Sequence, residues 1–134
     1  MEKRQYSQLG NGRPGKFSLS KRIASFGHAF NGLKILLKEE HNAIIHLFIT
    51  CCVVITGIEF KISTIEWIVV IFCIGLVFAL ELINSAIENT TDLISKERNE
   101  TIKKIKDLSA GAVLIAAIAS AVIGLIIFLP KMFL

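Results

Sequence analysis

Four polar side chains recur at helical spacing directly behind a long apolar run. The segment is ELINSAIENTTD, the run before it is WIVVIFCIGLVFAL, and the four residues are Glu81, Asn84, Glu88 and Asp92. At about 100° per residue they fall on one side of a helix and form a continuous polar stripe. Such carboxylates suit a hydrated Mg²⁺ held together with nucleotide phosphates, and one closer to the lipid could accept a proton from a hydroxyl group.

Glu81 carries the strongest functional signal in this stripe because it adjoins the apolar run. A charged side chain within the hydrocarbon costs about 2.5–3.5 kcal/mol on insertion scales, so Glu81 should face protein or trapped water. For Asp92, Glu97 and Glu100, the solvated end of a helix explains the charges equally well. The stripe by itself would also suit the ion pathway of a transporter or pore.

Composition and hydropathy indicate an integral membrane protein with an all-α fold. The 134 residues are 53 % hydrophobic and 19 % charged, and the mean hydropathy is +0.63. The charged residues gather between apolar runs, as expected when polar segments lie outside a bilayer. The net charge is +4, but most basic residues flank apolar runs. Anionic headgroups and membrane topology explain them better than nucleic acid, which we do not expect as a partner.

Four helices should position the polar stripe. The first, at about 20–40, is predicted to be an amphipathic surface helix whose apolar side carries Ile23, Phe26, Phe30, Leu33 and Leu37. Three transmembrane helices should follow at about 43–60, 65–94 and 108–129. The polar segment 1–19 is interpreted as a flexible tail, and 20–134 as one membrane domain.

The predicted spans differ in what they carry. The second would be about 45 Å long if unbroken, so the end bearing the stripe should project beyond the hydrocarbon. The third has small residues at every fourth position, which favour close helix packing, and Pro130 is expected to end it. His46, near the start of the first span, is expected to be buried or to reach toward the interface, with a ligand role as the alternative.

The distribution of basic residues predicts the topology. Eight Lys or Arg precede the first span and five lie between the second and third, whereas only Lys61 and Lys131 lie elsewhere. The positive-inside rule therefore places the N-terminus and the connection 95–107 in the cytoplasm and the C-terminus outside. The stripe then lies where the cytoplasm meets the membrane.

At these residues the sequence resembles the prokaryotic diacylglycerol kinase family, which includes the undecaprenol kinases. The segments that carry the resemblance are FGHAFNGLKILLKEEHNAIIH, ELINSAIENTTDLI and KDLSAGAVLIA, and it extends from about Lys21 to Phe128. The chain contains neither GxxxxGK[ST] nor the protein-kinase motifs, so an ATP site here would be built without those phosphate loops. The resemblance implies a homotrimer of the bacterial inner membrane, with interfacial active sites that transfer the γ-phosphoryl of MgATP to a lipid hydroxyl.

The resemblance also implies roles for individual residues. Glu81 matches the catalytic base, Asn84 a residue that orients the site, and Glu40 and Glu88 the ligands of Mg²⁺. Contacts with the nucleotide are implied for Lys21, His28, Glu40, Glu88, Glu97, Arg98, Asn99, Lys106 and Asp107. Contacts with the lipid substrate are implied for Lys21, Glu81 and Ala110.

The acceptor lipid is not determined by these motifs. Diacylglycerol, which would give phosphatidic acid, is the first expectation. Undecaprenol is the alternative, because EEHNAIIH resembles the undecaprenol kinases more closely. A transporter or pore subunit without enzymatic activity is a remote third possibility. It would conduct ions and form no ATP-dependent lipid product.

Overall fold

A computed structural model of the chain describes residues 18–95, 97 and 99–133, without the side chains of Ser20 and Lys21. The tail predicted at 1–19 lies almost wholly outside the described residues, as does Arg98. The chain divides into two compact units, Met1–Asn31 and Gly32–Leu134. The first helix contributes residues to both units, and the other helices belong to the second.

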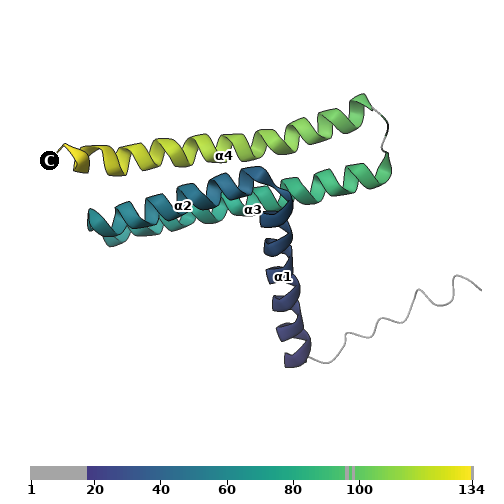
Figure 1. Cartoon of the computed structure of the whole chain (residues 1–134), viewed down its shortest axis with the longest axis horizontal. Coiled ribbons are helices and arrows are strands. Elements are labelled where there is room, and N and C mark those ends of the chain that lie inside the picture. The colour runs from purple at the N-terminus through teal and green to yellow at the C-terminus, as the bar shows by residue number, and fades with distance from the viewer. Residues whose placement is uncertain (1–17, 96, 98, 134) are drawn as a thin grey trace, which may run out of the picture. The chain divides into compact units, whose positions relative to one another are not determined.

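The described residues form four α-helices and no strand (Figure 1). They are α1 (Leu19–Glu39), α2 (His41–Glu59), α3 (Thr64–Ile94) and α4 (Glu100–Met132). By length and composition, α2, α3 and α4 could each cross a membrane. The predicted all-α fold with three candidate spans is therefore confirmed. The surface role of α1 and the homotrimer remain predictions.

The beginning of α3 is set by a capping box. Ser63 precedes the helix, its Oγ accepts a hydrogen bond from the backbone N–H of Glu66, and its own N–H donates to Oε2 of Glu66. These two bonds satisfy backbone donors that a helix N-terminus would otherwise leave unpaired. Oε1 of Glu66 lies 3.0 Å from Nζ of Lys131, so the same carboxylate links the start of α3 to the end of α4.

The fourth helix is longer than the apolar segment that predicted it. It begins at Glu100, where Oδ1 of Asn99 accepts hydrogen bonds from the first turn, and it continues through Pro130 to Met132. The prediction that Pro130 ends the helix is wrong. Proline lacks the N–H that would bond one turn back, but only two helical residues follow it, so the loss falls in the last turn.

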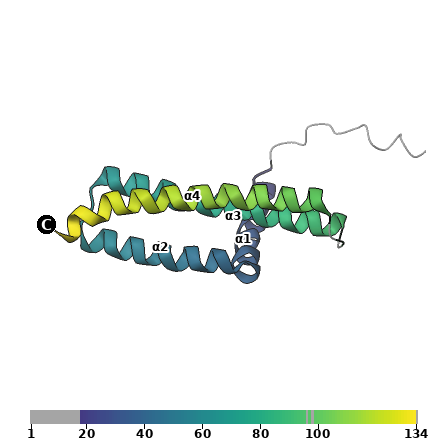
Figure 2. The same ribbon diagram turned by 90° about the horizontal axis from the view of Figure 1, so that it is seen from above.

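Within the second unit, α3 packs extensively against α4 and less extensively against α2 (Figures 1 and 2). A core of Ile62, Val70 and Ile127 lies near the connection between α2 and α3. Gly57 is buried there, and a Cβ at this position would lie 2.9 Å from the Trp67 ring. Glycine therefore allows α2 to approach α3 at this end.

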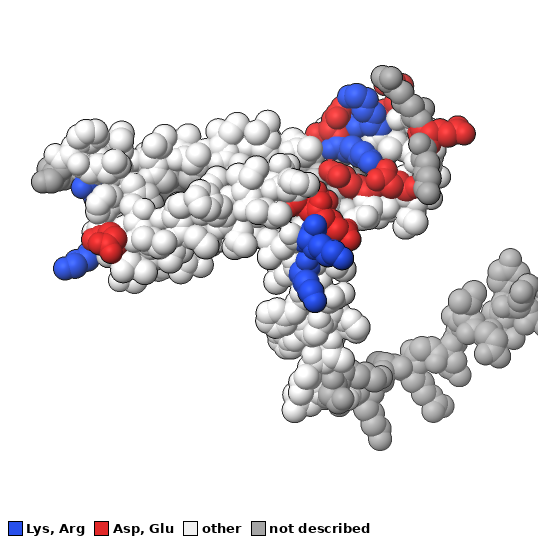
Figure 3. All heavy atoms as spheres, in the orientation of Figure 1, with Lys and Arg blue, Asp and Glu red and all other residues white. Residues whose placement is uncertain are grey.

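The charged residues lie toward the ends of the long helices. Figure 3 shows acidic and basic side chains at both ends of the second unit and an uncharged surface between them on the face in view. The 31 residues of α3 correspond to about 47 Å, compared with about 30 Å of hydrocarbon. One or both ends of α3 must therefore extend into the polar region.

Candidate functional site

The polar stripe on α3 faces the protein over its first two positions. Glu81 is 2 % exposed and Asn84 is 7 % exposed, whereas Ile83, on the opposite side, is 54 % exposed. Glu88 is half-buried and Asp92 is exposed. The prediction that Glu81 faces protein is therefore confirmed, and the stripe runs from the interior of the bundle to its surface.

Glu81 meets a histidine from another helix. Nε2 of His46, on α2, lies 3.2 Å from Oε1 of Glu81, within ion-pair distance when the imidazole is protonated. Oε1 is buried and accepts no aligned hydrogen bond from the described residues. No motif in the sequence pairs these two residues, and the only signal is a titratable side chain inside each of two apolar runs.

Asn84 is held between α4 and the next turn of its own helix. The Oγ of Ser109 donates to Oδ1 of Asn84 at 2.6 Å, and Nδ2 of Asn84 donates to Oε1 of Glu88 at 2.9 Å. The backbone oxygen of Lys106 lies 3.0 Å from the same hydroxyl. Because the Ser109 hydroxyl occupies the amide oxygen, the amide NH₂ is directed toward Glu88. Ser109 is thus a site residue for which the sequence predicted no such role.

Glu81 lies on the wall of the smaller of two cavities that share wall residues. The smaller has a volume of about 300 Å³ and is lined by Asn42, Ile45, His46, Glu81, Asn84, Ala110, Val113, Leu114 and Ala117. The predicted lipid contacts Glu81 and Ala110 both lie on its wall. A larger, mainly apolar cavity of about 650 Å³ lies between α2, α3 and α4 and shares His46 and Ala117 with the smaller one.

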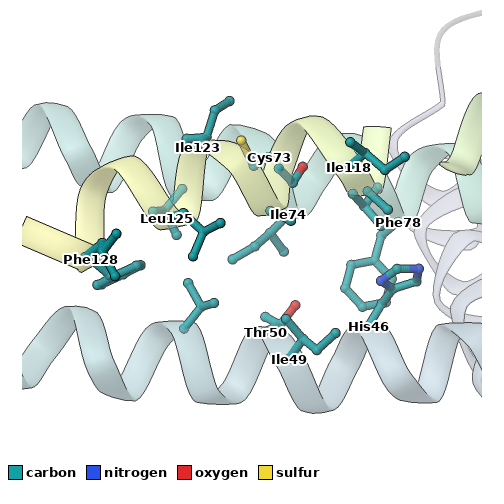
Figure 4. Close-up of a pocket in the computed structure, with 18 of the residues that line it drawn as sticks. His46, Ile49, Thr50, Cys73, Ile74, Phe78, Ile118, Ile123, Leu125 and Phe128 are labelled. Carbon is teal, nitrogen blue, oxygen red and sulfur yellow. The ribbon is translucent and has the colours of Figure 1, made fainter. Parts of the chain in front are cut away.

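Figure 4 shows the larger cavity from inside the bundle. His46 of α2 and Phe78 of α3 lie at one end, and Phe128 of α4 lies toward the other. The walls between them are aliphatic, with Thr50 and Cys73 among the few heteroatom-bearing side chains. An apolar chain in this cavity could therefore place a polar head near His46 and Glu81.

The two predicted metal ligands lie on different elements, Glu40 between α1 and α2 and Glu88 on α3. Glu40 is half-buried at the N-cap position of α2, where its side chain makes no capping hydrogen bond. Glu40 and Glu88 are both close enough for their charges to act on Glu81. Within the described part of the chain, no three side chains of the types His, Cys, Asp and Glu converge on one point.

Three of the predicted nucleotide contacts lie on other segments of the chain than Glu40 and Glu88. His28 is exposed on the part of α1 that belongs to the first unit. Glu97 is exposed in the connection between α3 and α4, and Asn99 uses its side-chain oxygen to cap α4. Arg98 and the side chain of Lys21 lie outside what the structure describes.

Lys106 and Asp107 each have an ion-pair partner within the chain. Nζ of Lys106 lies 2.6 Å from Oδ1 of Asp92, and Lys103 pairs with Asp107 one turn along α4. Asp92 is therefore more than a solvated helix end, since it joins α3 to α4 where both helices carry charge. The side chain of Asp92 is 64 % exposed and that of Lys106 is 32 % exposed, so water reaches this pair.

The fold and the site together define a helical membrane protein in which a buried carboxylate lies beside an apolar cavity. The family described as prokaryotic diacylglycerol kinase matches the chain over residues 27–128. The chain belongs to this family and is a membrane lipid kinase. The resemblance found in the sequence and the predicted enzyme class are thereby confirmed.

Three characterised relatives cover most of the chain. An undecaprenol kinase of Bacillus subtilis is 42 % identical over 114 residues, which are 85 % of this chain and 93 % of that protein. A diacylglycerol kinase of Synechocystis is 33 % identical over 111 residues, 82 % of this chain and 63 % of that protein. A diacylglycerol kinase of Haemophilus influenzae is 35 % identical over 111 residues, 82 % of this chain and 94 % of that protein.

Proposed function

We propose that this chain transfers the γ-phosphoryl group of ATP to the hydroxyl of undecaprenol. The support for this acceptor is the 42 % identity with a relative named undecaprenol kinase, compared with 33 % and 35 % for the two named diacylglycerol kinases. Diacylglycerol is the first expectation from the sequence, but the EEHNAIIH segment and these identities favour undecaprenol. Diacylglycerol remains the second candidate because two relatives carry its name.

One observation carries the proposed chemistry: the buried carboxylate of Glu81 lies on the wall of the smaller cavity, which adjoins the apolar one. In the proposed reaction Glu81 takes the proton of the lipid hydroxyl as its oxygen forms a bond to the γ-phosphorus. The bond from that phosphorus to the β,γ-bridging oxygen breaks, and ADP leaves with the electron pair. The products are the lipid monophosphate, ADP and a proton, first held on Glu81.

Glu40 and Glu88 would hold Mg²⁺ with the nucleotide. Their carboxylates fit this ion, which binds proteins through one or two carboxylates and takes its other ligands from phosphates and water. Bound there, Mg²⁺ supplies positive charge that offsets the charge of the phosphate oxygens. Asn84 would keep the Glu88 carboxylate in place through the 2.9 Å hydrogen bond from its amide.

The remaining nucleotide contacts are proposed for the charged end of the second unit and for α1. Lys106 would exchange Asp92 for a phosphate oxygen, and an exposed ion pair contributes only about 0–1 kcal/mol, so a phosphate can compete for the lysine. Asp107 would contact the adenosine. The other residues for which we propose a contact with the nucleotide are Lys21, His28, Glu97, Arg98 and Asn99.

The proposed cellular setting follows the charge distribution and the family. The protein would lie in the bacterial inner membrane, with the N-terminus and the connection between α3 and α4 in the cytoplasm. It would form a homotrimer with active sites between subunits. In support, many large apolar side chains on α2, α3 and α4 are exposed in the single chain, for lipid or for other copies to cover.

The acceptor can be tested with the purified full chain in mixed micelles. The protein receives MgATP labelled at the γ-phosphorus and either undecaprenol or diacylglycerol at equal mole fraction, with a micelle lacking both lipids as the control. Labelled undecaprenyl phosphate formed at the higher kcat/KM is the expected result. Faster formation of phosphatidic acid would overturn the proposed acceptor. If neither lipid is phosphorylated by folded protein, the proposed kinase activity itself fails.

A further inference from the structure

His46 is placed to act on the same reaction from another helix. It lines both cavities, and its Nε2 lies 3.2 Å from Oε1 of Glu81. Its side chain is 20 % exposed, whereas that of Glu81 is 2 % exposed, so protein surrounds this contact. The two atoms are within hydrogen-bonding distance but are not aligned as a hydrogen bond, and no other described residue gives the buried Oε1 one.

We infer that His46 is a positioning residue for Glu81: a small rotation of its ring would turn the 3.2 Å contact into a hydrogen bond donated by Nε2 to Oε1. A neutral imidazole carries one N–H and one unprotonated nitrogen, and the contact with a carboxylate favours the proton on Nε2. With Oε1 occupied in this way, Oε2 is the oxygen that accepts the proton of the lipid hydroxyl. His46 itself gains and loses no proton in this arrangement.

The surroundings of the carboxylate explain why it needs a partner. Asn84, one turn further along α3, is already committed to Ser109 and Glu88 through both ends of its amide. The other charged groups that act on Glu81 are the carboxylates Glu40 and Glu88, which repel it. Without His46, nothing described in the chain fixes the rotation of the Glu81 carboxylate. A base that turns freely would meet the lipid hydroxyl in the correct geometry less often.

The position of His46 also fits the path proposed for the lipid. His46 lines both the apolar cavity and the smaller, more polar one, and Figure 4 shows it at one end of the apolar cavity. A lipid alcohol whose chain lies in the larger cavity would bring its hydroxyl to the His46–Glu81 pair. The inference rests on the proposed role of Glu81, and its test must separate the two.

The test compares His46→Leu, which cannot donate a hydrogen bond, with His46→Gln, whose amide N–H can. We expect His46→Leu to lower kcat about 10- to 100-fold, the loss typical when the hydrogen-bond partner that orients a functional group is removed. The KM for ATP should change little, because His46 is not among the proposed nucleotide contacts or metal ligands. His46→Gln should keep kcat within about threefold of the wild type, since it restores the donor.

Thr56→Val is the matched control. Thr56 also lies on α2, but its hydroxyl donates only to the backbone oxygen of Cys52 in the same helix, at 2.8 Å. This variant should keep the wild-type kcat. A purely structural role of His46 would lower kcat equally in His46→Leu and His46→Gln, and that result would overturn the inference.

A double variant separates this inference from the proposed function. In the Glu81→Gln background there is no carboxylate to orient, so adding His46→Leu should reduce kcat by less than about twofold. If His46→Leu lowers kcat in this background by the same factor as in the wild type, His46 does not act through Glu81. If Glu81→Gln is inactive while His46→Leu works at the wild-type rate, only the inference fails. If Glu81→Gln turns over normally, the proposed function fails first.

Discussion

Replacing Glu81 by glutamine tests the proposed base with almost no change in side-chain shape. General acid–base groups contribute about 10²- to 10⁴-fold to a rate, and each tenfold corresponds to about 1.4 kcal/mol. We therefore expect kcat for lipid phosphorylation to fall by at least about 100-fold, an increase of about 2.7 kcal/mol or more in the activation free energy. The KM for ATP should be nearly unchanged, because Glu81 is not among the proposed nucleotide contacts.

The structure also predicts what happens to the fold of this variant. Oε1 of Glu81 accepts no aligned hydrogen bond, and burying a charged carboxylate costs free energy that a neutral amide does not. Glu81→Gln should consequently unfold in detergent at the same temperature as the wild type or at a higher one. Loss of activity could then not be attributed to misfolding.

The assay is phosphorylation of the lipid by the purified variant at saturating MgATP, with Glu66→Gln as the matched control. Glu66 lies on the same helix but at its other end, where it forms the capping box and the contact with Lys131. Glutamine also serves in capping boxes, so this control should fold and keep its kcat. Turnover by folded Glu81→Gln within about threefold of the wild type would refute the role of Glu81 as the base.

Three further predictions follow from contacts in the second unit. Glu88→Gln removes one hard oxygen ligand, so it should chiefly raise the Mg²⁺ concentration needed for half-maximal rate; an unchanged metal titration would contradict the assignment. Ser109→Ala removes the hydrogen bond to the amide oxygen of Asn84, whose NH₂ group holds Glu88. It should therefore also raise the Mg²⁺ concentration needed for half-maximal rate, by a smaller factor than Glu88→Gln in the same assay. Gly57→Ala places a Cβ 2.9 Å from the rigid Trp67 ring, and overpacking of this kind costs about 1–3 kcal/mol against about 0.5–1 kcal/mol gained in helix propensity. It should lower the unfolding temperature and leave kcat unchanged, whereas an unaltered unfolding temperature would show that the ring moves aside.

Local patterns were sufficient to predict the helices. An apolar run of sufficient length predicts a span, and polar residues three and four positions apart predict a stripe on one side of it, because both depend only on the geometry of a single helix. The burial of Glu81 followed from its place next to the apolar run, because a charge in the hydrocarbon is costly. The end of α4 was not predicted correctly, because the effect of Pro130 depends on how many helical residues follow it.

The partners of the stripe could not be predicted in this way. His46 and Glu81 lie on different helices, and so do Ser109 and Asn84; their contacts depend on how α2 and α4 are rotated and shifted against α3. The sequence left open whether Asp92 is a solvated helix end, and the structure pairs it with Lys106 of the next helix. Small shifts of one helix along another would replace each of these contacts with a different one.

The sequence by itself determined that this chain is helical and suited to a membrane, and its motifs resemble a family of lipid kinases. It also determined which residues share a side of the second span, because helical periodicity is a property of consecutive residues. Only the tertiary structure decided that an imidazole from α2 reaches the buried carboxylate and that a hydroxyl from α4 orients the asparagine beside it. The physical reason is that these contacts arise from side-chain packing between helices, to which residues far apart in the chain contribute together.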